Sequence, residues 1–287
     1  MKLVRFGAAG AERPGLVNAD GSISDLSGVI PELGGAALST DSLNKLALLD
    51  AAKLPRAPAG ARLGACVGGV GKFIAIGLNY ADHAAETGAK IPAEPIVFMK
   101  ATSCIAGPND TVLKPRGSTK MDWEVELGVV IGSVTRYVSE ADAPKHIAGY
   151  CVVNDLSERA FQLERGGQWD KGKGCDTFGP LGPWLVTRDE VPDPQSLRLW
   201  LAVDGKRYQD GSTRTMIFDV ATLVSYISQF MSLQPGDVIS TGTPPGVGLG
   251  QKPEPVFLRA GQTMRLGIDG LGEQQQRTVA ARVPEAR

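Results

Sequence analysis

The chain of 287 residues lacks the features that mark several large classes of protein. Its four cysteines form no C-x-x-C pair, so neither a zinc site nor a disulfide framework is indicated, and we expect reduced, mostly buried thiols. It has 30 basic and 31 acidic residues without the dense basic run that nucleic acid or anionic lipid requires. It has no run of about 18 apolar residues and no apolar signal-peptide core at residues 1–10. These absences favour a cytoplasmic protein that binds small neutral or anionic molecules, and they argue against nucleic-acid and membrane partners.

What is present indicates a strand-rich chain in two parts. Residues 1–65 are predicted to form a small N-terminal α/β domain, which ends in a Pro-, Gly- and Ala-rich linker at 54–64, and residues 66–287 to form the main domain. Short apolar runs predict strands at 72–79, 95–101, 125–132, 149–155, 182–187, 197–205 and 236–244. Helices are expected at 80–88, 157–167 and 219–233. This irregular order predicts an α+β, β-rich fold and not a regular βαβ alternation.

A Glu-x-Glu pair interrupts one of the predicted strands. Glu124 and Glu126 alternate with apolar residues, so both side chains point to one face, with Cα atoms roughly 6.6 Å apart. A solvated face would explain such a pair, but the apolar run through Ile131 is typical of a strand that is covered on both faces. Two buried like charges need compensation. A divalent cation between the carboxylates would provide it.

Asp155 could complete such a metal site. It follows the predicted strand at 149–155, and together with Glu124 and Glu126 it supplies the hard oxygen ligands that Mg²⁺, Mn²⁺ or Ca²⁺ prefer. An alternative is structural, because Asp155 and Glu158 have the spacing of a helix capping box.

The chain holds only two histidines. His83 and Glu86 lie three residues apart in a predicted helix, so they share a face and can hydrogen-bond. A base with an orienting carboxylate is typical of general base catalysis, although a polar surface helix would show the same spacing. His146 has no such partner in sequence and is interpreted as a surface or packing residue.

Two glycine-rich stretches could bring their backbone close to a ligand. Residues 168–183 contain Lys173, and their composition predicts a loop without regular structure. Residues 240–250 offer Thr241, Thr243 and several amide N–H groups to an anion. This second stretch lacks the GK[ST] ending of a phosphate-binding loop, which argues against a nucleotide site.

Six motifs, taken in order, resemble those of the shorter branch of the fumarylacetoacetate hydrolase family. They are GLNYADHAAETG, FMKATS, MDWEVELGVVIG, VVNDLSERAFQ, KGKGCDTFGPLGPW and ISTGTPPGVG, and the resemblance covers roughly residues 70–287. It implies a rolled, mixed β-sheet core and a homodimer. It also implies that Glu124, Glu126 and Asp155 bind Mg²⁺ or Mn²⁺, with Ca²⁺ as an alternative.

The same resemblance assigns roles to further residues. It implies that His83 and Glu86 activate water and that Lys173 stabilises an enolate. The residues that it implies as substrate contacts are Arg159, Gln162 and Thr243. Full-length fumarylacetoacetases carry a larger N-terminal domain and an additional carboxylate ligand that we do not find in this sequence, which argues against fumarylacetoacetate itself as the substrate.

The implied reaction is hydrolysis of a C–C bond in a 2,4-dioxo acid, which yields pyruvate and a carboxylic acid. The stretch around Lys173 is similar to that of sugar-acid enzymes, so 2,4-diketo-3-deoxy-rhamnonate or -fuconate is the expected substrate. The alternatives on the same site are ureidoglycolate lyase, oxaloacetate decarboxylase and hydroxy-dienedioate isomerase. A non-catalytic protein that binds small acids is a further alternative, against which His83, Glu86 and Lys173 argue.

Overall fold

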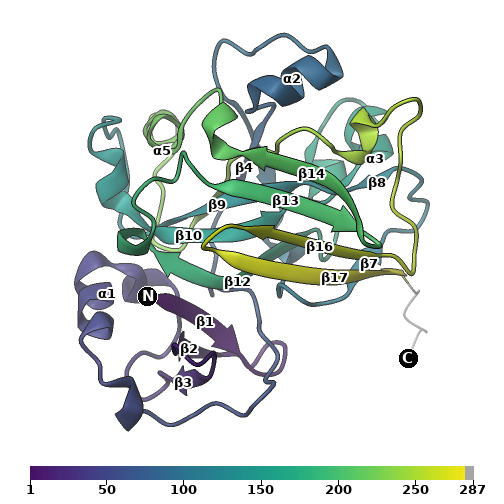
Figure 1. Ribbon diagram of the computed structural model, residues 1–287. Coiled ribbons are helices and arrows are strands. Elements are labelled where there is room, and N and C mark those ends of the chain that lie inside the picture. The colour runs from purple at the N-terminus through teal and green to yellow at the C-terminus, as the bar shows by residue number, and fades with distance from the viewer. Residues whose placement is uncertain (282–287) are drawn as a thin grey trace.

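The computed structural model describes residues 1–281, in which strands predominate over helices (Figure 1). The strands are β1 (Lys2–Phe6), β2 (Arg13–Val17), β3 (Ile23–Asp25), β4 (Phe73–Gly77), β5 (Ile96–Lys100), β6 (Ile105–Ala106), β7 (Val112–Lys114), β8 (Met121–Asp122), β9 (Val125–Ile131), β10 (Ile147–Asn154), β11 (Ser157–Glu158), β12 (Gly179–Thr187), β13 (Arg198–Val203), β14 (Lys206–Ser212), β15 (Val238–Ser240), β16 (Thr263–Ile268) and β17 (Gly272–Ala280). The α-helices are α1 (Thr40–Ala47), α2 (Ala81–Thr87), α3 (Arg159–Leu163), α4 (Asp170–Lys173) and α5 (Val220–Ile227).

The main sheet runs through most of the molecule. Within residues 1–281 it has ten strands in the order β3-β2-β1-β12-β10-β9-β15-β4-β5, with β6 beside β12. Strand β15 pairs parallel with β4 and antiparallel with β9, so the sheet is mixed. Strands β9 and β10 are buried at every residue, which explains why both are largely apolar apart from Glu126 and Asn154. The predicted α+β, β-rich class is therefore confirmed.

A second sheet lies across one face of the first. In the described part of the chain it has the strand order β14-β13-β16-β17-β7, and Figure 1 shows it in front of β9, β10 and β12. Leucines of β13 and β16 fill the space between the two sheets, for example Leu199, Leu201 and Leu266, each fully buried. The curved main sheet and this covering sheet enclose one hydrophobic core.

The N-terminal strands continue the main sheet. Strand β1 pairs antiparallel with β12, with Leu3 opposite Leu185. Arg62 donates to both carboxylate oxygens of Asp110, and this pair ties the linker to the rest of the molecule. Figure 1 shows β1, β2, β3 and α1 gathered at the lower end of the sheet. A domain boundary at residue 65 stays a prediction.

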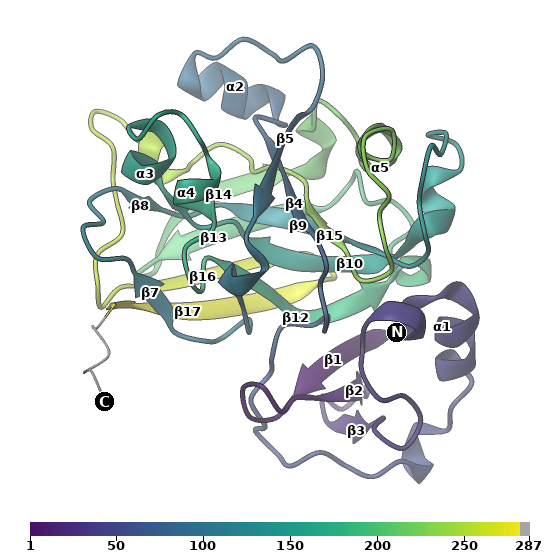
Figure 2. The same ribbon diagram turned by 180° about the vertical axis from the view of Figure 1, so that it is seen from behind.

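The segment 168–183 contains regular structure, so the prediction of an irregular loop is wrong. Helix α4 forms within it, and β12 begins at Gly179. Gly172 allows α4 to pack closely, because a Cβ at this position would lie 2.5 Å from the Glu158 carbonyl oxygen. Figure 2, which views the molecule from behind, shows α3 and α4 side by side in front of the sheets, and α4 contacts β5. The glycines thus serve close packing of this helix.

Three of the four cysteines lie in the protein interior. Among residues 1–281 no disulfide forms; Cys66, Cys104 and Cys151 are buried and Cys175 is half-buried, as predicted.

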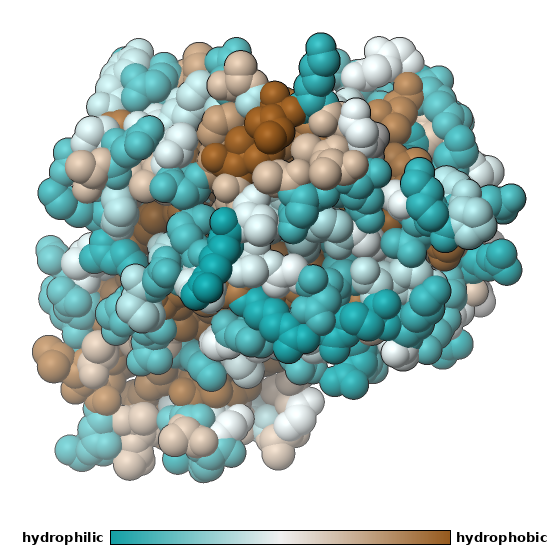
Figure 3. Space-filling model, turned by 45° about the horizontal axis from the view of Figure 1, so that its top comes forward, coloured by the Kyte–Doolittle hydropathy of each residue, from teal (hydrophilic) through white to brown (hydrophobic). Residues whose placement is uncertain are grey.

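Within the same residues no helix has the length and apolar character needed to cross a membrane. Figure 3 tilts the end with α2 toward the viewer and shows an apolar patch among hydrophilic side chains. A gathered apolar patch is typical of a surface that contacts another molecule.

Candidate active site

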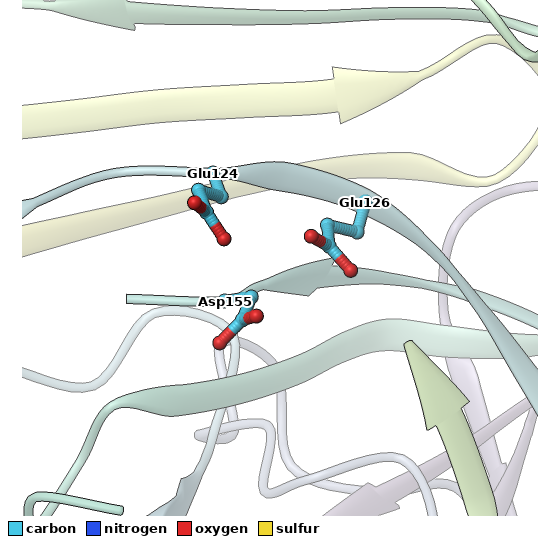
Figure 4. Close-up of side chains that lie close together, drawn as sticks. All are labelled: Glu124, Glu126 and Asp155. Carbon is cyan, nitrogen blue, oxygen red and sulfur yellow. The ribbon is translucent and has the colours of Figure 1, made fainter. Parts of the chain in front are cut away.

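Three carboxylates converge where β9 begins and β10 ends. Glu124 directly precedes β9, Glu126 is its second residue, and Asp155 follows β10, whose Asn154 pairs with Val125. One carboxylate oxygen of each lies within 4.8 Å of the others. Figure 4 shows the three side chains pointing toward one another. Their exposed fractions are only 5%, 1% and 1%, so these charges are held away from water.

Buried cations surround two of the three carboxylates. Lys173 Nζ donates to Glu124 Oε2 at 2.6 Å and to Asp155 Oδ2 at 2.7 Å. Lys100 Nζ donates to the other oxygen of Asp155 at 2.6 Å. Arg159 Nη2 donates to Glu124 Oε1 at 2.6 Å. Glu124 and Asp155 are therefore each paired with two positive charges.

Glu126 has a different environment. It accepts hydrogen bonds from Ser240 Oγ at 2.6 Å and from Gly242 N at 2.9 Å, and within residues 1–281 no lysine or arginine lies within ion-pair distance of it. Burial, together with the charges of Asp155 and Glu124, raises the pKa of Glu126 well above its ordinary value. A divalent cation would compensate this carboxylate, and a set of hard carboxylate oxygens suits Mg²⁺ or Mn²⁺. The residues present therefore fit such an ion.

Glu124 shows the opposite behaviour. Burial alone would raise its pKa, but the Lys173 ammonium and the Arg159 guanidinium lower the pKa of Glu124 to about 2. Attraction to Asp155 and Glu124 outweighs burial and raises the pKa of Lys173. Glu124 and Lys173 are thus both charged at neutral pH, and they form a fixed ion pair inside the site.

The capping-box interpretation of Asp155 is wrong. Helix α3 begins at Arg159, and the residue that caps it is Glu158, whose side chain accepts a hydrogen bond from Ala160 N. The Asp155 carboxylate is instead occupied by Lys100 and Lys173. The sequence spacing alone could not separate these two arrangements.

Helix α2 carries the predicted histidine–glutamate pair. His83 Nδ1 lies 3.1 Å from Glu86 Oε2, and Glu86 also accepts a hydrogen bond from Gly246 N at 3.0 Å. The helix starts directly after Tyr80, whose buried hydroxyl has no hydrogen-bond partner within the described residues. Burial and then the charge of Glu126 raise the pKa of Tyr80. One segment, residues 240–246, contacts both groups: Ser240 Oγ and Gly242 N donate to Glu126, and Gly246 N donates to Glu86. That the pair and the triad act together stays a prediction.

The predicted substrate contacts differ in their surroundings. Arg159 and Gln162 are 6% and 4% exposed, and Arg159 Nη1 donates to Gln162 Oε1 at 3.1 Å beside Glu124. The Thr243 hydroxyl instead donates to the Val125 carbonyl oxygen at 2.9 Å and accepts a hydrogen bond from Gln209 at 2.8 Å. Thr243 thus holds β9 in place. A role in substrate binding stays a prediction for all three.

Two charged residues of the site were not found from the sequence. Lys100 at the end of β5 contacts Asp155, as described above. Asp122 in β8 is fully buried and accepts hydrogen bonds from Arg159 Nε at 2.8 Å and from the main-chain amide of Gly248 at 2.6 Å. The signal that could have found them is a charged residue within an apolar strand motif, FMKATS or MDWEVEL.

Comparisons with known proteins agree with this architecture. A family model described as fumarylacetoacetate (FAA) hydrolase C-terminal matches residues 72–279. A protein from Burkholderia ambifaria, named as a presumed hydrolase, is 66% identical over 282 residues, which cover 98% of this chain and 100% of the relative. The chain therefore belongs to the fumarylacetoacetate hydrolase family, as its motifs predicted.

Solved structures of the family include two kinds of enzyme. Maleylpyruvate hydrolase from Sphingobium sp. SYK-6, in complex with manganese(II) and pyruvate, is 30% identical with a TM-score of 0.82, over 98% of this chain and 100% of that one. A 5-carboxymethyl-2-hydroxymuconate delta-isomerase from Mycobacterium smegmatis is 32% identical with a TM-score of 0.77, over 99% and 100%. This chain is accordingly an enzyme of a family with hydrolases and isomerases.

Proposed function

We propose that the protein is a metal-dependent hydrolase that cleaves the C–C bond of a 2,4-dioxo acid to give pyruvate and a carboxylic acid. The observation that carries this proposal is the buried convergence of Glu124, Glu126 and Asp155. The segment 242–246, whose amides donate to Glu126 and to Glu86, connects this triad to the His83–Glu86 pair. The solved relative that holds manganese and pyruvate supports it. We propose Mg²⁺ or Mn²⁺ as the resident ion, with Ca²⁺ as the alternative.

In the proposed reaction the metal-binding triad and the His83–Glu86 pair have different roles. A divalent cation on the three carboxylates would supply a Lewis acid for the 1-carboxylate and 2-oxo oxygens of the substrate. His83 donates its Nδ1–H to Glu86, and in this tautomer Nε2 carries the lone pair of the base, which takes a proton from water in our proposal. The resulting hydroxide attacks C4. When the adduct collapses, the C3–C4 electron pair moves to C3 to give the enolate of pyruvate, and His83 returns the proton to C3.

Lys173 is placed to act on the enolate. Its ammonium lies between Glu124 and Asp155, and the ring of Phe98 lies 5.3 Å from Nζ on another side. A fixed positive charge in a water-poor site stabilises negative charge that develops during the reaction, without reorganisation. We therefore assign Lys173 to the enolate oxygen.

Isomerisation of a hydroxy-dienedioate is the second candidate, because a solved relative is named as an isomerase of such a compound. Isomerisation moves a proton between carbons and needs no attack by hydroxide. Decarboxylation of oxaloacetate and lysis of ureidoglycolate use the same site without hydrolysing a dioxo acid. A non-catalytic protein would bind the metal and turn over none of these compounds.

The acyl half of the substrate would be recognised by polar groups. Arg159 and Gln162 lie beside Glu124, and Lys173 lies on the adjoining helix. A site built from hydrogen-bonding groups can discriminate against an apolar analogue by roughly 10⁴-fold, because those groups lose their partners. We therefore propose a 2,4-diketo-3-deoxy sugar acid, such as the rhamnonate or fuconate, as the substrate.

A turnover screen with Mn²⁺ or Mg²⁺ tests both levels of the proposal. We expect a higher kcat/KM for the sugar acid than for an unhydroxylated acylpyruvate of equal length. The reverse preference would refute the sugar-acid assignment and leave the C–C hydrolase in place. Isomerisation or decarboxylation without hydrolysis of any 2,4-dioxo acid would refute the hydrolase.

We also propose that the protein forms a homodimer. A homodimer is supported by the apolar patch of Figure 3 and by exposed apolar side chains such as Ile91 and Ile96. Light scattering of the purified protein tests it, and a monomer at micromolar concentration would contradict it. A cytoplasmic location stays a prediction from the sequence.

A further inference from the structure

The segment 246–250 lies between the two halves of the site. Gly246 N donates to Glu86 Oε1 at 3.0 Å. Gly248 N and Leu249 N donate to Asp122 Oδ1 at 2.6 Å and to Asp122 Oδ2 at 3.0 Å. Main-chain amides of one short segment thus contact the carboxylate that orients His83 and a second carboxylate on β8.

Asp122 extends this connection to the triad. Its carboxylate accepts a hydrogen bond from Arg159 Nε at 2.8 Å, and Arg159 Nη2 donates to Glu124 Oε1 at 2.6 Å. A continuous path of charge-assisted hydrogen bonds therefore runs from Glu124 through Arg159 and Asp122 to the segment that holds Glu86. Such bonds are among the stronger ones in proteins, and they fix geometry.

The segment cannot easily take another position. Gly246 has a φ of +103°, and a Cβ there would lie 2.0 Å from the Tyr208 carbonyl oxygen. A Cβ on Gly248 would lie 2.7 Å from Asp122 Oδ1. The indole Nε1 of Trp123 also donates to the Gly246 carbonyl oxygen at 3.1 Å. Strand β8 and the residue after it therefore set where this segment lies.

We propose that Asp122 is a positioning residue that controls both the metal affinity of the triad and the geometry of the His83–Glu86 pair. The first effect follows from Arg159, which orients Glu124; the second follows from the segment 246–250 and rests on the proposed function. Residues that orient metal ligands typically contribute 10–100-fold to metal affinity or activity.

The chemistry of the carboxylate explains why asparagine cannot replace it. Each group that contacts Asp122 is a donor: the amides of Trp123, Gly248 and Leu249 and the guanidinium of Arg159. An asparagine would turn an NH₂ group toward at least one of these donors and would remove the charge that Arg159 faces.

The metal arm of the test needs no substrate. Asp122→Asn should raise the Kd for Mn²⁺ about tenfold or more, measured by calorimetry or by the EPR signal of free Mn²⁺. The matched control is Asp237→Asn, because Asp237 is also buried and accepts two main-chain amides, of Lys72 and Gln234, but contacts no residue of the site. Its Kd for Mn²⁺ should stay unchanged even if its melting temperature falls. An unchanged Kd in Asp122→Asn would refute this arm.

The dyad arm uses turnover at saturating Mn²⁺. Asp122→Asn should lower kcat about tenfold or more, and the double variant with Glu86→Gln should lose less than the product of the two single losses, because both act on one contact. Trp123→Phe removes the hydrogen bond to Gly246 and part of the packing against Tyr208, but it keeps the carboxylate of Asp122 and its contact with Arg159, so it should lower kcat and leave the Kd for Mn²⁺ unchanged. Additive losses, or normal turnover in Trp123→Phe, would refute this arm.

The proposal can still be tested if Asp122→Asn does not fold or if the unaltered protein has no hydrolase activity. If Asp122→Asn does not fold, Trp123→Phe tests the dyad arm and Arg159→Lys tests the metal arm, because a lysine cannot bridge Asp122 and Glu124 with a planar fork. If the unaltered protein binds Mn²⁺ but hydrolyses no 2,4-dioxo acid, the proposed function fails, and the metal arm is still decided by the Kd values.

Discussion

The charge of Glu126 destabilises the metal-free fold, because this carboxylate is buried beside two other carboxylates. Its pKa is raised above the ordinary 4.5, so between 4.5 and the folded-state value the folded chain binds more protons than the unfolded chain. Glu126 therefore contributes less to the free energy of unfolding of the metal-free protein as the pH rises through this window. A glutamine at this position has no proton to lose.

We expect Glu126→Gln to become more stable relative to the unaltered protein as the pH rises from 5 to 8. Urea denaturation in the presence of a chelator measures this difference. Glu254→Gln, at an exposed position, should show a difference near zero at both pH values. A difference for Glu126→Gln that does not change with pH would show that the charge is already compensated without metal.

His83 is the residue on which hydrolysis depends in our proposal. His83→Ala should lower kcat by about 10²–10⁴-fold, the usual contribution of a positioned general base, and should leave the Kd for Mn²⁺ nearly unchanged. His146→Ala serves as the control, since His146 contacts Ser133 Oγ and no residue of the site. Near-normal hydrolysis in His83→Ala would remove this residue from the mechanism.

The segment 246–250 requires a glycine at position 246. Gly246→Ala should lower kcat and stability, because the new Cβ would clash with the Tyr208 carbonyl oxygen and displace the amide that holds Glu86. Gly270→Ala is the matched control: its φ of +81° is also left-handed, but a Cβ would meet nothing within 4 Å. The control should lose about 1–2 kcal/mol of stability through the left-handed backbone alone.

Activity in Gly246→Ala that matches Gly270→Ala, measured at saturating Mn²⁺, would show that the position of this segment does not matter for turnover. A loss of kcat in Gly246→Ala alone would separate the steric effect from the left-handed backbone that both positions share.

The elements also show what the sequence could predict. Strands β9 and β10 were predicted because both are largely apolar, and the alternation of Glu124 and Glu126 with apolar residues indicated that the two glutamates share a face. Strand β17 was not predicted. Its inward side chains include Gln274 and Gln276, which are buried and donate to the carbonyl oxygens of Val152 and Pro108.

A strand with polar side chains on its buried face does not show the alternation of apolar and polar residues by which strands are predicted. The partners that allow these side chains to be buried lie more than a hundred residues away in the sequence. The same reason hid Lys100 and Asp122 in the candidate site. Lys100 is satisfied by Asp155, and Asp122 by Arg159 and by amides of the segment 246–250, all distant in sequence. Motifs pointed to Glu124, Glu126 and Asp155, which the structure brings together, whereas Lys100 and Asp122 became visible only in three dimensions.

For the whole molecule, metal binding should raise thermal stability. An ion that binds only the folded state stabilises it by about 2.7 kcal/mol at a concentration of 100 times its Kd. We therefore expect the melting temperature to fall after exhaustive chelation and to recover with Mn²⁺ or Mg²⁺, as measured by differential scanning calorimetry. Identical melting curves before and after chelation would contradict binding at the triad.

The pairing of β1 with β12 has a consequence for any attempt to shorten the chain. Strand β12 leads out of the segment that carries Lys173, and β1 covers its outer side through Leu3 and Leu185. A chain cut at residue 65 would open the edge of β12 at Leu185 and Val186, whose pairing with β1 would be lost, while β6 would still pair with Gly179 and Pro180. Open edges of apolar strands pair with other copies and aggregate. The N-terminal strands therefore protect this edge of the main sheet from pairing with other copies. A shortened chain that keeps the candidate active site would need a designed replacement for β1.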